Sequence, residues 1–554
     1  MTTNIKDWYK SGAPWIWLVA GAVSVSLLMV FGVLALTAAR GLTYFWPATV
    51  VQLEYQTADG PAQRLVGEIQ DSEEVPAARV TGAGVQLPDD SPAVVRHLLK
   101  TGNRDIFGSD FRWILQPFVV SREAPSDLVV IERREWGNFY GYLVSVKENG
   151  ALVAEGDEAW SAFQTHAAAT AELHQRIKQI EKDAIGDVNY AIEQLRLTTR
   201  GLELEGELTP AAQADIEQQH AVLSEEFAAL ERELNELYQE IERNSYVVET
   251  MDGRQVELPF SKVVRAFKPN SMSLLQKVGH YFEKLWEFVS DEPREANTEG
   301  GIFPAIFGTV LMVMLMSIIV TPLGVIAAVY LREYAKQGFI TRLIRIAVNN
   351  LAGVPSIVYG LFGLGFFVYF LGGTLDQLFY PEALPAPTFG TGGIIWASLT
   401  LSILTLPVVI VATEEGLSRI PRAIREGSLA LGATKAETLW RTVIPMASPA
   451  IMTGLILAVA RAAGEVAPLM LVGVVKLAPS LPLDSNAPFL HLDRKFMHLG
   501  FHIYDVGFQS PNVEAARPLV YATALLLVVV IMVLNLAAIT IRNHLREKYR
   551  NLES

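Results

Sequence analysis

Hydrophobic residues run almost unbroken through six stretches of the chain. These stretches lie at about residues 14–38, 303–331, 349–371, 392–413, 447–475 and 519–541. Because a helix needs roughly 20 predominantly apolar residues to cross a bilayer, the pattern predicts six membrane spans. A cleaved signal peptide is the alternative for the first stretch, since Lys6 and Lys10 precede it and Ala38 and Ala39 close it. Its apolar run exceeds the roughly 7 to 15 residues of a signal core, which favours a retained span.

Lysine and arginine are unevenly distributed among the connections between these stretches. Residues 332–347 contain four, residues 414–446 contain five and the tail from 542 contains four, whereas residues 372–393 contain none. Since such residues gather on the cytoplasmic side, both termini and the loops 332–347 and 414–446 are expected in the cytoplasm. Residues 40–300 and 476–518 are then expected outside.

The long outer segment has two patterns. Apolar and polar residues alternate over residues 48–157 and again over 245–260, which predicts a β-rich domain. Residues 158–243 instead place apolar residues at spacings of three and four, with Thr209 and Pro210 suited to begin a second helix. We expect a coiled-coil helical hairpin inserted into the β-rich domain.

Residues 274–289 form an amphipathic, aromatic-rich segment just before the second span. It is expected either to lie along the outer membrane surface or to be a plain solvated helix.

The loop between the fourth and fifth spans predicts a helix, a glycine and a second helix. Gly432 suits the left-handed conformation that ends a helix. Thr434 and Glu437 have the spacing of a capping box, so the second helix is expected to begin at once. The resulting elbow would expose apolar side chains at 429–431, a face suited to docking a partner at the membrane surface.

Two charges interrupt the fifth stretch. Arg461 and Glu465 share one helix face, and each costs about 2.5 to 3.5 kcal/mol at a bilayer centre, so both are expected to face protein or water. Pro468 removes the hydrogen bond to the Gly464 carbonyl and predicts a kink, as Pro355 does in the third span. The charges are either a structural ion pair that locks helices together, or a site where Arg461 binds an oxyanion and Glu465 orients it.

Composition and missing motifs exclude several functions. With 51% hydrophobic and 19% charged residues, the 554-residue chain is too apolar for an ordinary soluble protein, and its net charge of −14 argues against nucleic acid. Cysteine is absent, which excludes thiolate metal sites and thiol nucleophiles. No phosphate-binding G-x-x-x-x-G-K-[ST] loop occurs, so the chain itself is not expected to hydrolyse ATP. The outer loop before the sixth stretch crowds several polar residues at irregular spacing, which we interpret as fortuitous rather than as a metal site: His491, Asp493, His498, His502 and Asp505.

The elbow resembles the loop by which permease subunits of ABC importers dock their ATPase. Glu426, Gly432 and Pro445 match the spacing of its E-A-A, three residues, G, nine residues, I-x-L-P pattern. Four positions depart from the pattern: Gly427 and Ser428 replace the alanines, Thr442 replaces the isoleucine and Ile444 replaces the leucine. The spacing therefore matches the pattern, although four of its residue types differ.

Three further stretches are similar to the PstA family of permease subunits of phosphate-specific ABC importers. They are "GGIFPAIFGT" (300–309), "LAGVPSIVYGLFGLGFF" (351–367) and "VARAAGEVAPLML" (459–471). The resemblance covers about residues 297–545 and transfers nothing to residues 48–290.

The resemblance implies a mostly α, MetI-like six-span permease core for inorganic phosphate in a bacterial inner membrane. Together with the apolar stretches and the charge bias, it divides the chain into a cytoplasmic start and first span (1–39), a periplasmic domain (40–300), a permease domain (301–545) with the coupling loop 414–446, and a cytoplasmic tail (546–554). The implied partners are a PstC-like permease, a PstB-like ATPase dimer that uses the ATP, a PstS-like phosphate-binding protein and membrane lipid. No cofactor is implied for this chain.

Two alternatives remain open. One is a permease for another oxyanion, such as sulfate or molybdate. The other is a membrane-anchored signalling or scaffold subunit that acts through the hairpin.

Overall fold

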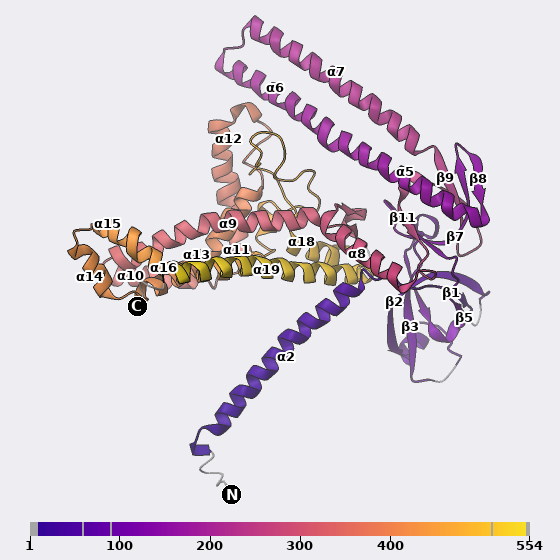
Figure 1. The fold of residues 1–554 in the computed structure, drawn as a ribbon, viewed down its shortest axis with the longest axis horizontal. Helices are drawn as coiled ribbons and strands as arrows, with labels where there is room; N and C mark the ends of the chain where they lie inside the picture. Colours follow the sequence, from indigo (N-terminus) through magenta and orange to yellow (C-terminus); the bar gives the residue numbers. More distant parts are fainter. Residues whose placement is uncertain (1–8, 58–59, 89–90, 511–512, 550–554) are drawn as a thin grey trace.

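The chain forms a bundle of long helices, a β-rich region at one end of the bundle, and a helical hairpin that projects from the β-rich region (Figure 1). The computed structural model describes residues 9–57, 60–88, 91–510 and 513–549. Lys6 and the end of the predicted cytoplasmic tail lie outside the described residues.

Within these described residues, six helices are long and apolar enough to cross a membrane, which confirms the predicted number of spans. Several are assembled from consecutive α-helical and π-helical pieces. In chain order the pieces are α2 (Ala13–Thr43), α9 (Phe303–Val329) with η6 (Tyr330–Tyr334), α11 (Ser356–Phe362) with η7 (Gly363–Gly372) and α12 (Gly373–Phe379), α13 (Ile394–Arg419), α15 (Lys435–Thr438) with η9 (Leu439–Val443) and α16 (Ile444–Ala462), and α19 (Val513–Tyr549).

The predicted bounds of the third span were wrong. The apolar stretch was expected to begin at about residue 349, but the spanning helix begins at Ser356, and a separate helix, α10 (Phe339–Leu351), occupies much of the expected loop. Pro355 explains the difference, because proline lacks a backbone N–H and disfavours helix in the residue before it. The helix therefore breaks where only a kink was expected.

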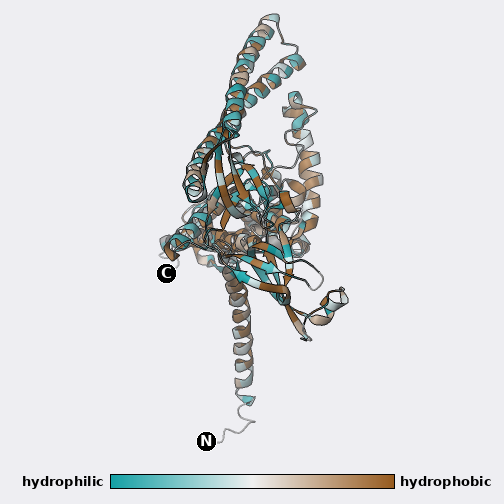
Figure 2. Cartoon of the chain, turned by 90° about the vertical axis from the view of Figure 1, so that its right-hand side faces the viewer, coloured by the Kyte–Doolittle hydropathy of each residue, from teal (hydrophilic) through white to brown (hydrophobic). Residues whose placement is uncertain are grey.

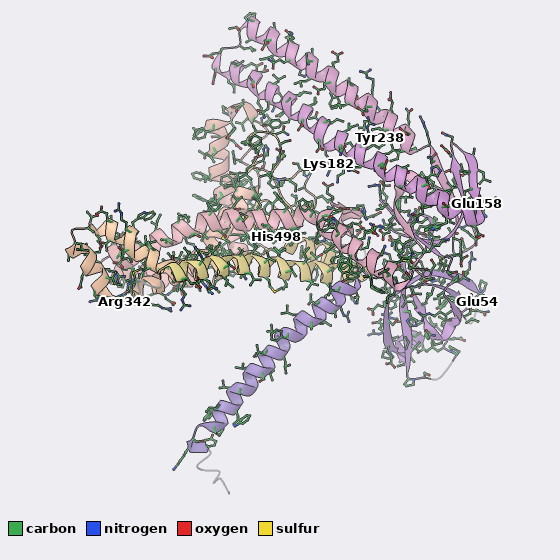
Figure 3. The ribbon with its side chains drawn as sticks, viewed as in Figure 1. Glu54, Glu158, Lys182, Tyr238, Arg342 and His498 are labelled. Atoms are coloured by element: carbon green, nitrogen blue, oxygen red, sulfur yellow. The ribbon has the colours of Figure 1, made fainter. Side chains whose placement is uncertain are left out.

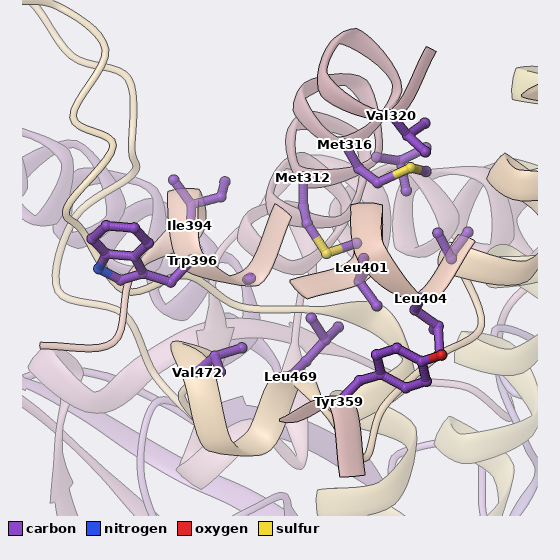
Figure 4. Close-up of a cluster of buried hydrophobic side chains, with 14 of the residues drawn as sticks. Met312, Met316, Val320, Tyr359, Ile394, Trp396, Leu401, Leu404, Leu469 and Val472 are labelled. Atoms are coloured by element: carbon purple, nitrogen blue, oxygen red, sulfur yellow. The ribbon is translucent and has the colours of Figure 1, made fainter. Parts of the chain in front are cut away.

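Helix α13 forms the centre of the bundle and packs against α9 and α16. Two-thirds of its most apolar window (67%) is buried inside the structure. Figure 4 shows Met312, Met316 and Leu401 meeting in the main apolar cluster. Glycine allows close approach, since a Cβ at Gly454 would lie 2.7 Å from the Ala412 Cβ. Small residues at helix contacts are typical of membrane bundles.

Helix α2 contacts the bundle mainly along α19 near its own C-terminal end. There Gly41 approaches so closely that a Cβ would lie 2.9 Å from the Tyr521 carbonyl oxygen. None of its most apolar window is buried, and Figure 2 shows hydrophobic residues along most of the helix. A helix that is apolar and exposed all round requires lipid or a partner protein.

The β-rich region contains two larger antiparallel sheets. The first has the order β4-β3-β2-β1-β5, and the second has the order β10-β9-β7-β6-β11 with β8 also paired to β7. The strands are β1 (Val50–Tyr55), β2 (Gln63–Pro76), β3 (Ala93–Lys100), β4 (Phe111–Leu115), β5 (Val119–Glu123), β6 (Val129–Arg133), β7 (Phe139–Glu148), β8 (Ala151–Glu155), β9 (Asn244–Glu249), β10 (Gln255–Pro259) and β11 (Val263–Phe267). Short helices α3 (Ala77–Gly82) and α4 (Arg104–Phe107) and the strand pair β12 (Pro293–Arg294) and β13 (Glu299–Gly300) complete it.

The helical hairpin leaves this region after β8 and returns at β9. Its first limb is α5 (Ala159–Gln179), the π-helical η3 (Ile180–Ala184) and α6 (Ile185–Glu205), and its second limb is α7 (Pro210–Ile241). Thr209 Oγ1 accepts a hydrogen bond from the Ala212 N–H at 3.2 Å and so caps α7. At the base, Ile177 and Ile180 pack against Leu237 and Ile241.

Helix α8 (Leu274–Ser290) turns its charged side inward. Glu287 is buried and accepts hydrogen bonds from Arg265 at 3.0 Å and Arg294 at 2.7 Å. The apolar side faces outward, with Leu275 82% and Trp286 71% exposed. The position of α8 along the membrane surface stays a prediction.

Candidate functional site

The fifth span is broken beside its two charges. Helix α16 ends at Ala462, and a short helix, α17 (Leu469–Val472), begins only after Pro468. Between them the chain turns, with the Gly464 N–H donating to the Arg461 carbonyl at 3.3 Å. The prediction of a kinked but continuous helix to about residue 475 was therefore wrong. Gly464 lowers helix propensity and Pro468 lacks an N–H, and together they break the helix.

Arg461 and Glu465 lie close together at this break. Arg461 Nε is 3.5 Å from Glu465 Oε1, and the two side chains are 32% and 18% exposed. Within the described part of the chain, no atom accepts a hydrogen bond from the Arg461 guanidinium. Since a guanidinium carries five N–H donors, this group can bind an anion without giving up an existing hydrogen bond.

Helix α11 packs directly against the break. A Cβ at Gly360 would lie 2.6 Å from the Pro468 Cα, so this contact requires glycine. Pro355 has no N–H to donate to the Leu351 carbonyl, which instead accepts hydrogen bonds from the Val354 N–H at 3.1 Å and from the Tyr359 hydroxyl at 2.6 Å. Sequence reasoning missed Tyr359, although its position four residues after the proline was a usable signal. The two proline sites thus lie on neighbouring elements.

The cytoplasmic elbow has the predicted local structure. Helix α14 (Arg422–Ala430) ends before Gly432, which has a positive φ of 89°. Thr434 and Glu437 form the capping box of α15, with the Thr434 N–H donating to Glu437 Oε2 at 2.9 Å. The hydroxyls of Ser428 and Thr438 lie 2.9 Å apart and join the two limbs.

The elbow presents apolar side chains to its surroundings. Leu431 is 91% exposed, and Trp440 on the following turn is 75% exposed. Glu426 and Gly427 are also exposed, and Glu426 has no ion-pair partner among the described residues. At the far end of the motif, Ile444 and Pro445 begin α16 and are half-buried. Sequence reasoning missed Trp440.

An ion pair fixes the elbow to the bundle. Arg425 Nη2 lies 2.9 Å from Glu333 Oε1 at the end of the second span. The same guanidinium donates to the carbonyls of Leu417 at 2.8 Å and Ile420 at 2.7 Å. Nearby, Arg345 on α10 pairs with Glu414 on α13 at 2.6 Å. These pairs link segments far apart in sequence, which is why the sequence did not predict them.

The outer histidines have separate surroundings. His491 lies 2.9 Å from Asp484, whereas His498 and His502 are buried, and burial lowers their pKa values to about 3 and about 4. Among the described residues, His498 Nε2 and both ring nitrogens of His502 are buried without a hydrogen-bond partner. Across the described ranges, no group of three or more candidate ligands could hold a metal ion.

The hairpin contacts the outer loop that follows α17. Asp187 Oδ1 accepts a hydrogen bond from Asn486 Nδ2 at 3.0 Å. The Tyr190 hydroxyl donates to the Ala487 carbonyl, and its ring meets the His491 ring edge-on with centroids 6.4 Å apart. In Figure 3 Lys182 marks the first limb above the bundle, where it pairs with Glu292. The hairpin therefore touches the segment that continues directly from the broken span.

Known proteins resemble this chain over the bundle. Residues 320–551 match the family of binding-protein-dependent transport system inner membrane components. The probable ABC transporter permease protein YqgI of Bacillus subtilis (strain 168) is 32% identical over 260 residues, covering 46% of this chain and 81% of the relative. The phosphate transport system permease protein PstA 1 of Mycobacterium tuberculosis (strain ATCC 25618 / H37Rv) is 36% identical over 244 residues, covering 44% and 70%.

Among solved structures, a chain of the inward-facing MetNI methionine ABC transporter is 17% identical, with 50% of this chain and 99% of that chain covered and a TM-score of 0.33. The matching family model and the similarity to a phosphate permease agree with the six spans and with the elbow. The chain is therefore a multi-pass inner membrane protein that belongs to the family of ABC importer permease subunits.

Proposed function

We propose that this permease imports inorganic phosphate and forms half of the translocation path. The observation that carries the proposal is Arg461, a charged side chain at a broken span that is one-third exposed and has unused donors. A guanidinium can donate two parallel hydrogen bonds to one phosphate, which suits it to this substrate. The names of several relatives as phosphate permeases support the same substrate.

Glu465 would orient Arg461 and limit its affinity, so that the anion can leave again. At 3.5 Å the carboxylate competes with a bound anion for the same guanidinium. In the structural alternative the pair only locks helices together, but both charges belong to one segment of the chain, four residues apart. The exposure of Arg461 in the single subunit favours a role in the path or at the contact with a second permease.

The remaining parts fit an importer with separate subunits. The ATP would be used by a PstB-like ATPase dimer docked on the elbow around Glu426 and Leu431, because the elbow is exposed and anchored to the bundle by Arg425. A PstC-like permease would complete the pore, and a PstS-like binding protein would deliver phosphate from the periplasm. Both termini would lie in the cytoplasm and residues 40–300 in the periplasm. Helix α8 would rest its exposed apolar side on the outer membrane surface.

Uptake by the Arg461→Gln variant tests the substrate role. We expect the reconstituted importer to lose phosphate uptake while the subunit still assembles with its partners. Arg342→Gln is the matched control, since Arg342 is an exposed arginine on α10. Failure of the Gln variant to assemble would favour the structural pair. Sulfate or molybdate uptake that exceeds phosphate uptake in the unmodified importer would contradict the choice of phosphate.

The signalling alternative concerns the hairpin. Its contacts with residues 486–491 favour a role in transport, because they reach the loop behind the broken span. Deleting all of residues 160–243 would remove Phe163 from the core of the β-rich region. A cleaner truncation replaces residues 185–234 with a short turn, because Tyr238 on one limb hydrogen-bonds Glu181 on the other at 2.5 Å. Reduced uptake would tie the hairpin to transport, whereas unchanged uptake with altered signalling would favour recruitment.

A further inference from the structure

A basic cavity lies where the ends of three spans meet the elbow. Its volume is about 610 Å³, and its walls come from the end of α13, the start of α14, the first turns of α16 and the last turns of α19. The charged residues that line it are Arg419, Arg542 and Arg546, and apolar side chains such as Ile420, Ile424 and Met446 form much of the remaining wall.

The charge of this cavity is unbalanced. No aspartate or glutamate lines it. Arg542 and Arg546 are one helical turn apart on the same face of α19. Over the described ranges none of the three arginines forms an ion pair with a carboxylate. Arg542 donates a hydrogen bond to the neighbouring Asn543 Oδ1 at 3.4 Å.

Two arginines that pack between helices at the same end of the bundle are paired. Arg345 has Glu414 at 2.6 Å, and Arg425 has Glu333 at 2.9 Å. The fold therefore neutralises arginine here where the charge serves packing. Like charges that share one cavity repel each other, and a bound anion relieves this repulsion. The three cavity arginines share one cavity with no carboxylate in its walls, so they are available for an anionic ligand.

We propose that this cavity binds a phosphate group, supplied either by the headgroup of an anionic phospholipid or by inorganic phosphate. Guanidinium groups match phosphate oxygens in planar, paired hydrogen bonds. Basic pockets between membrane helices on the cytoplasmic side bind lipid headgroups, and the apolar wall of this cavity suits the glycerol and acyl portions of a lipid. The site is separate from Arg461 and does not depend on the proposed transport of phosphate.

A bound phosphate group would join the end of the sixth span to the elbow. Arg542 and Arg546 belong to α19, while Arg419 is the last residue of α13 and stands directly before the elbow. An anion held between them connects elements that otherwise have few polar contacts. The bound group would stabilise one position of the elbow relative to the bundle. Only the consequence of this for transport rests on the proposed function.

Binding to the purified full-length chain tests the proposal. In one arm, the chain in phosphatidylcholine nanodiscs is titrated with inorganic phosphate by calorimetry. In the other arm, retention of phosphatidylglycerol is measured by native mass spectrometry in mixed nanodiscs. We expect one of the two ligands to bind, and Arg542→Gln and Arg419→Gln to weaken that ligand by roughly tenfold each.

The controls separate this site from the transport path. Arg342→Gln removes one exposed arginine outside the cavity and should leave binding unchanged. Arg461→Gln should leave unchanged the component of binding that Arg542→Gln weakens, even if it abolishes uptake and any phosphate binding at the broken span. Binding of neither ligand would overturn the proposal, as would equal affinity of the Arg542→Gln and Arg342→Gln variants.

Discussion

Replacing Arg425 with alanine should release the elbow from the bundle. In the described structure this α14 side chain forms an ion pair with Glu333 and donates hydrogen bonds to the carbonyls of Leu417 and Ile420. Alanine is the best helix former, so the substitution leaves the intrinsic stability of α14 intact or improves it. Any loosening of the elbow must then come from the lost contacts rather than from a weaker helix.

The size of the effect follows from burial. Hydrogen bonds to charged groups contribute about 1.5 to 3 kcal/mol each, but contacts of one side chain are not additive and water screens exposed pairs. The side chains of Arg425 and Glu333 are only 18% and 13% exposed, so screening by water reduces the ion-pair energy only modestly. We expect a loss of about 2 kcal/mol, which corresponds to roughly a 30-fold increase in the open population of the elbow.

Hydrogen–deuterium exchange measures this opening directly, because amide exchange reports the population of locally open states. Amides of residues 422–438 should exchange roughly 30-fold faster in Arg425→Ala. Arg422→Ala is the control on the same helix, since Arg422 is exposed. A double-mutant cycle with Glu333→Gln isolates the ion pair. Unchanged exchange in Arg425→Ala, or effects of the two substitutions that simply add, would refute the reasoning.

Two further predictions concern other parts of the chain. Burial alone would raise the pKa of Glu132, but the charges of Lys284 and Arg265 lower it from 4.5 to about 2. The ionised Glu132 therefore stabilises the folded protein by about 3 kcal/mol above pH 4.5, and this contribution is lost as the pH falls through 2. Thermal unfolding midpoints measured from pH 7 to acid should fall less steeply in Glu132→Gln than in the unmodified protein. Gly432→Ala should destabilise the turn that ends α14 by about 1 kcal/mol, because its φ is 89°. Gly427→Ala, inside α14 with open space around it, should stabilise α14 by about 1 kcal/mol, and a reversed order in exchange of the elbow amides would contradict both expectations.

Features determined by local sequence were predictable. Six apolar runs gave six spans, because length and hydropathy alone decide whether a helix can cross a bilayer. The elbow followed from Gly432 and the Thr434–Glu437 spacing, since a positive φ and a capping box involve only a few consecutive residues. The start of α7 at Pro210 followed in the same way from the cap at Thr209.

Features that join distant segments were not predictable from one sequence. Hydropathy is continuous through Pro355 and Pro468, so the pattern could not distinguish a kink from a break. The outcome at Pro468 depends on α11, whose Gly360 fits against the broken backbone. The cavity arginines at 419, 542 and 546 are likewise brought together only when α13 and α19 meet in the bundle.

The contacts between the hairpin and the bundle make the outer loop a mechanical link. The end of α17 and the loop 473–498 that follows it both bind the start of α13. The Gly393 N–H donates to the Val472 carbonyl at 3.0 Å, and the Ile394 N–H donates to the Arg494 carbonyl at 3.0 Å. Tyr190 contacts the same loop from the hairpin. We expect a rearrangement of the break around Arg461 that moves α17 to be transmitted through this loop to the hairpin contact. Loss of the Tyr190 hydroxyl in Tyr190→Phe should consequently alter the motion of this loop while leaving the β-rich region folded.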